Sequence, residues 1–206
     1  MKMKAPLTIL SSLSLLMAPL SVNAARSLSV AETSEAWKTF TSDQSGFSVD
    51  LPASPEHLKQ KIDLPNTKIS IEYDTFISEP SDSVVYVVSV WNYPADIDMS
   101  NPQDNLKDGF DGMLAALPGS KVIKSDMTDL QGFKALEFLV KNDDIFFQGK
   151  LLIVYNTLYQ VFTVYKENVD MKKNYDQFSR SFKLLNPSKQ KMKVDSSKDN
   201  AQRLKI

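Results

Sequence analysis

Three aspartates recur at spacings that suit acid–base chemistry. Asp104, Asp108 and Asp111 are four and three residues apart, so on a helix they share one face. Paired carboxylates can act as general acid and base, as in glycoside hydrolysis. Asp104 also lies near the expected start of this helix, where negative charge opposes the helix dipole favourably. We interpret the three as a solvated helix face, and keep a hydrolase using these helix carboxylates as an alternative hypothesis.

The chain contains few of the residues that nucleophilic catalysis requires. There is no cysteine and one histidine, His57, and no G-x-S-x-G occurs. The same scarcity argues against a structural zinc or copper site. The six glycines form neither G-x-G-x-x-G nor a P-loop. We therefore predict a protein that is not an enzyme, with no catalytic, metal-ligating or cofactor-binding residues, and expect His57 in a solvated loop or at a strand edge.

Aromatic side chains offer a different kind of candidate site. Phe76, Trp91 and Tyr93 are our candidates for an aromatic binding patch, because such residues anchor many interfaces. Aromatic residues within strands more often belong to the core. Both interpretations stay open on the sequence alone.

Alternating apolar residues predict strands through much of the chain. The run from Ser83 to Pro94 does not alternate and is rich in β-branched and aromatic residues, which suits a central strand buried on both faces. The other predicted strands cover residues 37–40, 46–52, 68–78, 120–126 and 133–141.

The segment from Phe146 to Tyr165 is mostly apolar, yet polar residues interrupt it and its longest unbroken apolar piece has five residues. A spanning helix needs about 18, so we predict a β-hairpin in the middle of the sheet. Asn156 and Thr157 are placed at its turn, because Asn tolerates a positive φ. Gly149 indicates a bulge or a close approach of two backbones.

Two segments change to the period of a helix. Residues 100–119 place Leu106, Phe110 and Met113 on one stripe, behind a cap at Asn101 and Pro102 at the first helical position. Residues 169–185 show a second stripe, formed by Met171, Tyr175, Phe178 and Phe182.

Residues 1–24 have the layout of a secretory signal. Lys2 and Lys4 precede an apolar run from Leu7 to Leu20, and small residues lead to a predicted cleavage between Ala24 and Ala25. The apolar run is shorter than the ~20 residues of a membrane span, so no transmembrane anchor is expected after cleavage. A cysteine-free exported chain fits a bacterial periplasm better than an animal extracellular space.

The remaining chain divides into a flexible lead-in (25–36), a single domain (37–185) and a disordered basic tail (186–206). Cleavage leaves 22 basic and 25 acidic residues, which gives no electrostatic case for nucleic-acid binding. The tail has six basic and two acidic residues, so we expect weak contact with anionic surfaces at most.

The order of several short motifs resembles the PsbP/Mog1-like fold, in particular its bacterial exported members of unknown function. The resemblance covers about residues 37–185. The motifs are a GF-x-V-x-LP segment, an N-x-LY element at the hairpin turn and F-x-x-SF in the last helix, and they are carried by Gly46, Phe47, Val49, Leu51, Pro52, Asn156, Leu158, Tyr159, Phe178, Ser181 and Phe182.

The resemblance implies an α+β fold in which an antiparallel sheet is flanked by helices on both faces, an α/β/α sandwich. Members of that fold are mostly accessory or binding proteins, and fold alone does not fix function. We therefore expect an exported, periplasmic or secreted bacterial protein that binds an unknown protein or small ligand in the envelope. A small-ligand or lipid carrier is a further alternative.

Overall fold

The computed structural model describes residues 3–4, 37–63, 69–95 and 97–187. The predicted cleavage between Ala24 and Ala25, the lead-in and all but the first two residues of the predicted tail lie outside the described residues.

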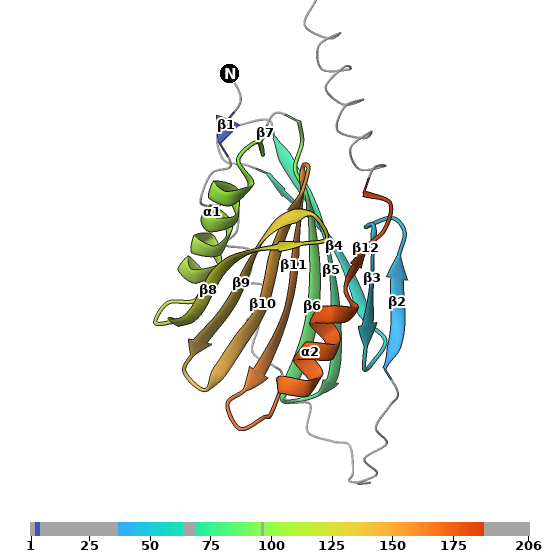
Figure 1. The fold of residues 1–206 in the computed structure, drawn as a ribbon, viewed down its shortest axis with the longest axis vertical. Helices are drawn as coiled ribbons and strands as arrows, with labels where there is room; N and C mark the ends of the chain where they lie inside the picture. The colour runs from blue at the N-terminus through green and yellow to red at the C-terminus, as the bar shows by residue number, and fades with distance from the viewer. Residues whose placement is uncertain (1–2, 5–36, 64–68, 96, 188–206) are drawn as a thin grey trace, which may run out of the picture.

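A seven-stranded antiparallel sheet forms most of the structure (Figure 1). Every neighbouring pair in it is antiparallel. Neighbouring strands also follow one another along the chain, except for the third and fourth strands in spatial order. Its strands are, in spatial order, β4 (Glu56–Asp63), β5 (Ser70–Ser81), β6 (Val84–Asn92), β11 (Thr157–Lys166), β10 (Ile145–Val154), β9 (Phe133–Asn142) and β8 (Lys121–Leu130).

Two smaller sheets and two helices complete the described structure. A three-stranded sheet has the order β12-β3-β2, and a two-stranded parallel sheet pairs β1 with β7. Figure 1 shows α1 at the left, and α2 beside the three-stranded sheet. The bounds are β1 (Met3–Lys4), β2 (Lys38–Ser42), β3 (Phe47–Leu51), β7 (Ile97–Asp98), α1 (Pro102–Ala115), α2 (Lys172–Ser181) and β12 (Lys183–Leu184).

Two core clusters lie on opposite faces of the large sheet. Leu151 and Leu152 are neighbours on β10, so their side chains point to opposite faces, and each belongs to a different cluster. The first cluster contains the apolar side chains of α1, whereas the second contains Phe178 of α2 and the apolar side chains of β3. Both faces of the central strands are therefore buried, as expected for the run from Ser83 to Pro94.

The structure is mostly β. The expected antiparallel sheet is present, whereas its flanking by helices on both faces is not confirmed. The cover over the second cluster is the three-stranded sheet together with α2. Sequence periodicity shows which residues of β2 and β3 are apolar, but it does not say that these strands pair with each other and with β12 away from the large sheet.

Both predicted helical segments are confirmed. The side chain of Asn101 accepts a hydrogen bond from the backbone N–H of Asp104, and Pro102 begins α1. This arrangement satisfies one of the N–H groups that a helix start leaves free. In the second segment the predicted stripe of Met171, Tyr175, Phe178 and Phe182 is buried in full.

The predicted β-hairpin is also confirmed, with a shift at its turn. Val154 pairs with Thr157, so the turn residues are Tyr155 and Asn156, and the positive φ of 54° belongs to Tyr155. The prediction of a turn at Asn156–Thr157 was therefore wrong by one residue. The long ladder between β10 and β11 fixes the register, and this outweighs the local preference of Asn for a positive φ.

Gly149 marks a close approach of two backbones. It lies directly opposite Phe162, and an added Cβ would be 2.3 Å from the Phe162 Cβ and 2.4 Å from the Val161 carbonyl oxygen. The pairing of β10 with β11 continues in register through this point, so Gly149 does not mark a bulge.

No helix in the described ranges is long and apolar enough to cross a membrane.

Candidate functional site: a groove at the open end of the sheet

One end of the large sheet is left open by the layer that covers its second cluster. Strand registers place Lys61, Glu72, Asn92 and Thr157 side by side in one row across β4, β5, β6 and β11. On β11, Thr157 is two residues from the core residue Tyr159, so the two side chains point to the same face of the sheet. On β6 and β11 this face therefore changes from apolar, at Val90 and Tyr159, to polar, at Asn92 and Thr157.

A groove of about 580 Å³ lies over this row, and we call it the open-end groove. Strands β4, β5, β6 and β11 form its floor, while the loop after β6 and the turns before β3 and β11 form its walls. The residues that line it are Gln44, Ser45, Lys59, Lys61, Ser70, Glu72, Asp74, Asn92, Tyr93, Pro94, Ala95, Asn156, Thr157 and Tyr159.

Hydrogen bonds hold the walls of the open-end groove in place. The Tyr159 hydroxyl donates to the backbone carbonyl of Ser45 at 2.8 Å. On the other wall, the Tyr93 N–H donates to the carbonyl oxygen of Asn156 at 2.9 Å, and the Asn156 amide donates to the Pro94 carbonyl at 3.4 Å. A groove whose walls are already ordered loses little entropy when a partner binds.

The floor of the groove carries both signs of charge. Lys59 and Glu72 are 3.9 Å apart, and both side chains are more than half exposed. Exposed pairs of this kind contribute little to stability and are screened by salt. Because Lys61 and Asp74 add one charge of each sign, the open-end groove does not select for a polyanion or a polycation.

Asp74 is a buried carboxylate at the edge of the groove floor. Its side chain is 8% exposed, and its Oδ1 lies 2.8 Å from Nε2 of His57. The His57 ring stacks on Phe76 at a centroid distance of 4.4 Å, and 47% of its side chain stays exposed. As predicted, His57 lies on an edge strand, since β4 ends the large sheet.

A His–Asp pair orients the base of many hydrolases, but a nucleophile must also lie within hydrogen-bond reach of the histidine. In the part of the chain that the structure describes, Asp74 is the hydrogen-bond partner of His57. We therefore assign the pair a structural role: His57 gives the buried carboxylate a partner, because an unpaired buried charge is costly.

Tyr93 is a buried groove residue whose hydroxyl is kept neutral. Burial raises its pKa well above the ordinary value of a tyrosine. The side chain itself belongs to the first core cluster, so its phenol stays protonated within the core.

The predicted aromatic patch is not brought together. Phe76 belongs to the second core cluster, while Trp91 and Tyr93 belong to the first, on the other face of the sheet. Trp91 stacks on Tyr73 at 4.1 Å. All three candidates are buried, and Tyr93 is the member that lines the open-end groove.

The helix carboxylates also lie apart from the groove. Asp104 accepts a hydrogen bond from the Asn101 side chain at 2.6 Å, which ties it to the start of α1. Asp111 is exposed and Asp108 is partly exposed. Across the described ranges, no group of three or more His, Asp or Glu side chains is arranged to hold a metal ion.

Several motif residues join the three-stranded sheet to the rest of the protein. Phe47 stacks on Phe182 at 5.8 Å. The Ser181 hydroxyl accepts a hydrogen bond from the Asp50 N–H at 2.9 Å and donates one to the Phe178 carbonyl at 2.8 Å. Gly46 has a φ of 72°, a conformation that favours glycine. These residues are explained by folding, and they position the Ser45 wall of the groove.

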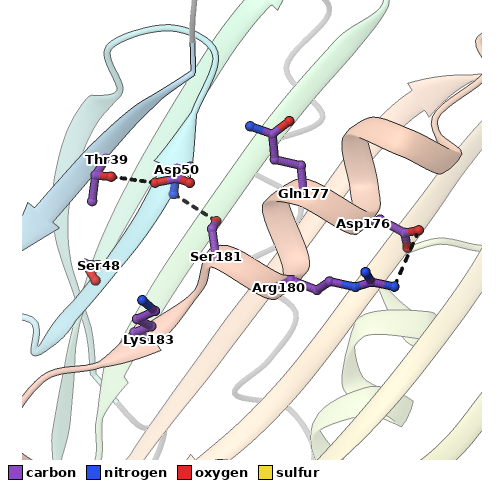
Figure 2. Close-up of a pocket in the computed structure, with 8 residues that line it drawn as sticks. All are labelled: Thr39, Ser48, Asp50, Asp176, Gln177, Arg180, Ser181 and Lys183. Carbon is purple, nitrogen blue, oxygen red and sulfur yellow. Dashed lines mark hydrogen bonds and ion pairs between the residues drawn. The ribbon is translucent and has the colours of Figure 1, made fainter.

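A second hollow, of about 470 Å³, lies between the three-stranded sheet and α2, and its lining is shown in Figure 2. Thr39 donates to the Asp50 carboxylate at 2.6 Å, and Arg180 is 3.9 Å from Asp176. Because its acidic side chains already have partners in the same hollow, we interpret it as the seam between two elements.

Reading the sequence missed strand β4 and with it the Asp74–His57 pair. The segment between two prolines does carry a signal, since Leu58, Gln60 and Ile62 are less exposed than their neighbours along β4. This alternation is weak because only two of the three residues are apolar. The partner strand of β4 cannot be inferred from it.

Comparisons with known proteins give a fold. No family model matches this chain, and no curated protein matches it. Among solved structures, it is similar to cyanobacterial PsbP (CyanoP) from Synechocystis sp. PCC 6803. The TM-score is 0.50 at 14% sequence identity, and the match covers 78% of this chain and 98% of that one. The chain therefore has a PsbP-like fold, as its motifs predicted.

Proposed function

We propose that this protein is an exported, non-enzymatic binding or accessory factor of a bacterial envelope, and that its partner docks in the open-end groove. The groove itself is the observation that carries the proposal: it is preformed, polar and placed where the cover of the sheet stops. The PsbP-like fold supports an accessory role of this kind. The two core clusters, with α1 in one and α2 in the other, support the finer description as an α/β/α sandwich.

A polar segment of another protein is the occupant that suits the groove. Its size falls within the usual range for ligand sites, ~300–1,000 Å³. Most of its lining side chains are polar, and Pro94 and Ala95 lie on its wall. Such a lining satisfies the hydrogen bonds of a peptide better than it shelters a lipid chain.

Capture from the cell envelope tests the groove. Immobilised protein should recover one defined partner, and Glu72→Lys should reduce the recovery at least tenfold by reversing a charge on the groove floor. Asp111→Lys is the matched control, because Asp111 is exposed on α1, away from the groove. Equal recovery with both variants, or recovery by neither the variants nor the original protein under several growth conditions, would count against this function.

The export part of the proposal rests on the leader pattern of residues 1–24. Fractionation of cells should place the protein outside the cytoplasm, and sequencing of its N-terminus should begin at Ala25. A cytoplasmic protein that keeps its leader would contradict it.

A further inference from the structure

Strand β8 is an exposed edge of the large sheet. It occupies the last position in the strand order, and within the described ranges it pairs with β9 alone. Its residues 121–127 are all exposed. An edge strand presents unpaired N–H and C=O groups to which another strand can add.

The same strand carries an unusual apolar surface. The large hydrophobic side chains that are exposed in the described part of the chain are Val122 (41%), Ile123 (50%) and Met127 (37%), and all three are on β8. Met127 lies opposite Leu136, and Val122 lies opposite Val140, two residues of the first core cluster. The exposed side chains therefore extend the α1 face of the sheet to its rim.

A β-bulge brings these side chains to one face. The register with β9 shifts between Val122 and Lys124, which leaves Ile123 as the extra residue. Side chains alternate along a strand, and Met127 and Ser125 lie opposite core residues on the α1 face. Ile123 is two residues before Ser125, so its side chain points to the same face. Lys124 and Asp126 point to the other face, where Lys124 lies 2.9 Å from Glu137.

The charges along β8 are complementary to those of the same strand running in the opposite direction. In an antiparallel pair with its two-fold axis at Ser125, Lys124 faces Asp126 of the second copy, and Ile123 faces Met127 of the second copy. An axis at Lys124 would place two lysines opposite each other, and one at Asp126 would place two aspartates there. With the axis at Ser125, opposite charges face each other and apolar side chains face each other.

We propose that β8 pairs with β8 of a second copy of this chain, antiparallel and about a two-fold axis at Ser125, so that the two large sheets become one. Because the interface is a single pair of strands, we expect the dimer to form only at high protein concentration. Lysines and bulges can also protect an edge strand from pairing with another chain. If β8 were protected in this way, charge reversals at Lys124 and Asp126 would not change association in the register-specific manner expected for a dimer.

Charge reversal tests the register. Sedimentation of the protein purified from cells should show a dimer at high concentration. Lys124→Asp alone and Asp126→Lys alone should each weaken it at least tenfold, because like charges then face each other. A mixture of these two variants should associate again, as should the double variant, since both arrangements restore opposite charges. Melting curves check that each variant is folded.

A cysteine placed at the axis gives an independent measurement. The chain has no cysteine of its own. Directly opposed residues of antiparallel strands have Cα atoms about 4.5–5.5 Å apart, within the range of a disulfide. Ser125→Cys should therefore form a disulfide-linked dimer under mild oxidation much faster than Asp129→Cys on the same strand. A monomer at all concentrations, a dimer indifferent to the charge reversals, or equal linking by the two cysteine variants would overturn the proposal.

Discussion

The hydroxyl of Tyr159 donates a 2.8 Å hydrogen bond to the backbone carbonyl of Ser45, a residue 114 positions earlier in the chain. The bond is buried, and it links the central strand β11 to the turn that precedes β3. It therefore fixes one wall of the open-end groove to the sheet.

Removing this hydroxyl should loosen the groove wall. Tyr159→Phe leaves the Ser45 carbonyl with one hydrogen bond fewer, so we expect the free energy of unfolding to fall by about 1–2 kcal/mol in urea titration. Tyr155→Phe, at the partly exposed hairpin turn, is the control and should change it by less than about 0.5 kcal/mol. Equal effects of the two substitutions would show that the hydrogen bond contributes nothing specific.

Gly149 should not accept a side chain. An alanine Cβ there would overlap the Phe162 Cβ and the Val161 carbonyl of the neighbouring strand, neither of which can rotate away. We expect Gly149→Ala to destabilise the fold by roughly 1–3 kcal/mol or more. Gly132→Asn, in an open turn with a φ of 84°, should cost less, because Asn tolerates this conformation. Thermal unfolding of the two variants gives the comparison, and a stable Gly149→Ala protein would refute it.

The partner of Asp74 should matter more than exposed charges nearby. His57→Ala leaves a buried carboxylate without its hydrogen bond and removes a ring stacked on Phe76. We expect a loss of about 1–3 kcal/mol in the free energy of unfolding. Lys61→Ala removes an exposed 4.0 Å pair with Asp63 and should cost less than about 0.5 kcal/mol. If both variants were equally stable, the His57–Asp74 contact would have no structural role.

The protein should lose stability in alkali. Burial raises the pKa of Tyr86 to about 12, above its value of 10.0 in an unfolded chain. Between these two pH values the unfolded state has released the proton and the native state has kept it, so stability falls as the pH rises, by up to about 1.4 kcal/mol per pH unit for this residue. Urea midpoints measured from pH 9 to pH 12 should therefore decrease above about pH 10. Tyr86→Phe should make the urea midpoint decrease less steeply with pH. If the slope did not change, groups other than Tyr86 would be responsible for the decrease.

Periodicity in the sequence was enough to predict both helices and most strands, because burial of one face imposes a spacing that can be read directly. It also identified Gly149, where a small residue interrupts a strand. The hairpin turn was misplaced by one residue because the ladder that sets its register extends over the whole of β10 and β11.

The candidate site was much harder to predict than the fold. The open-end groove is built from the turn at Ser45, the strands β4 to β6 and the turn at Asn156, segments separated by up to about 110 residues. Their proximity depends on strand order, which local patterns do not encode. The pair of His57 and Asp74 arises in the same way, from the register of β4 with β5.

The claim that a partner occupies the open-end groove is tested most directly by photo-crosslinking in living cells. A photoreactive residue at Glu72, on the groove floor, should give an adduct with one defined envelope protein, whereas the same residue at Asp111 on α1 should not. Adducts of the same partner at both positions, or at Asp111 alone, would contradict the account.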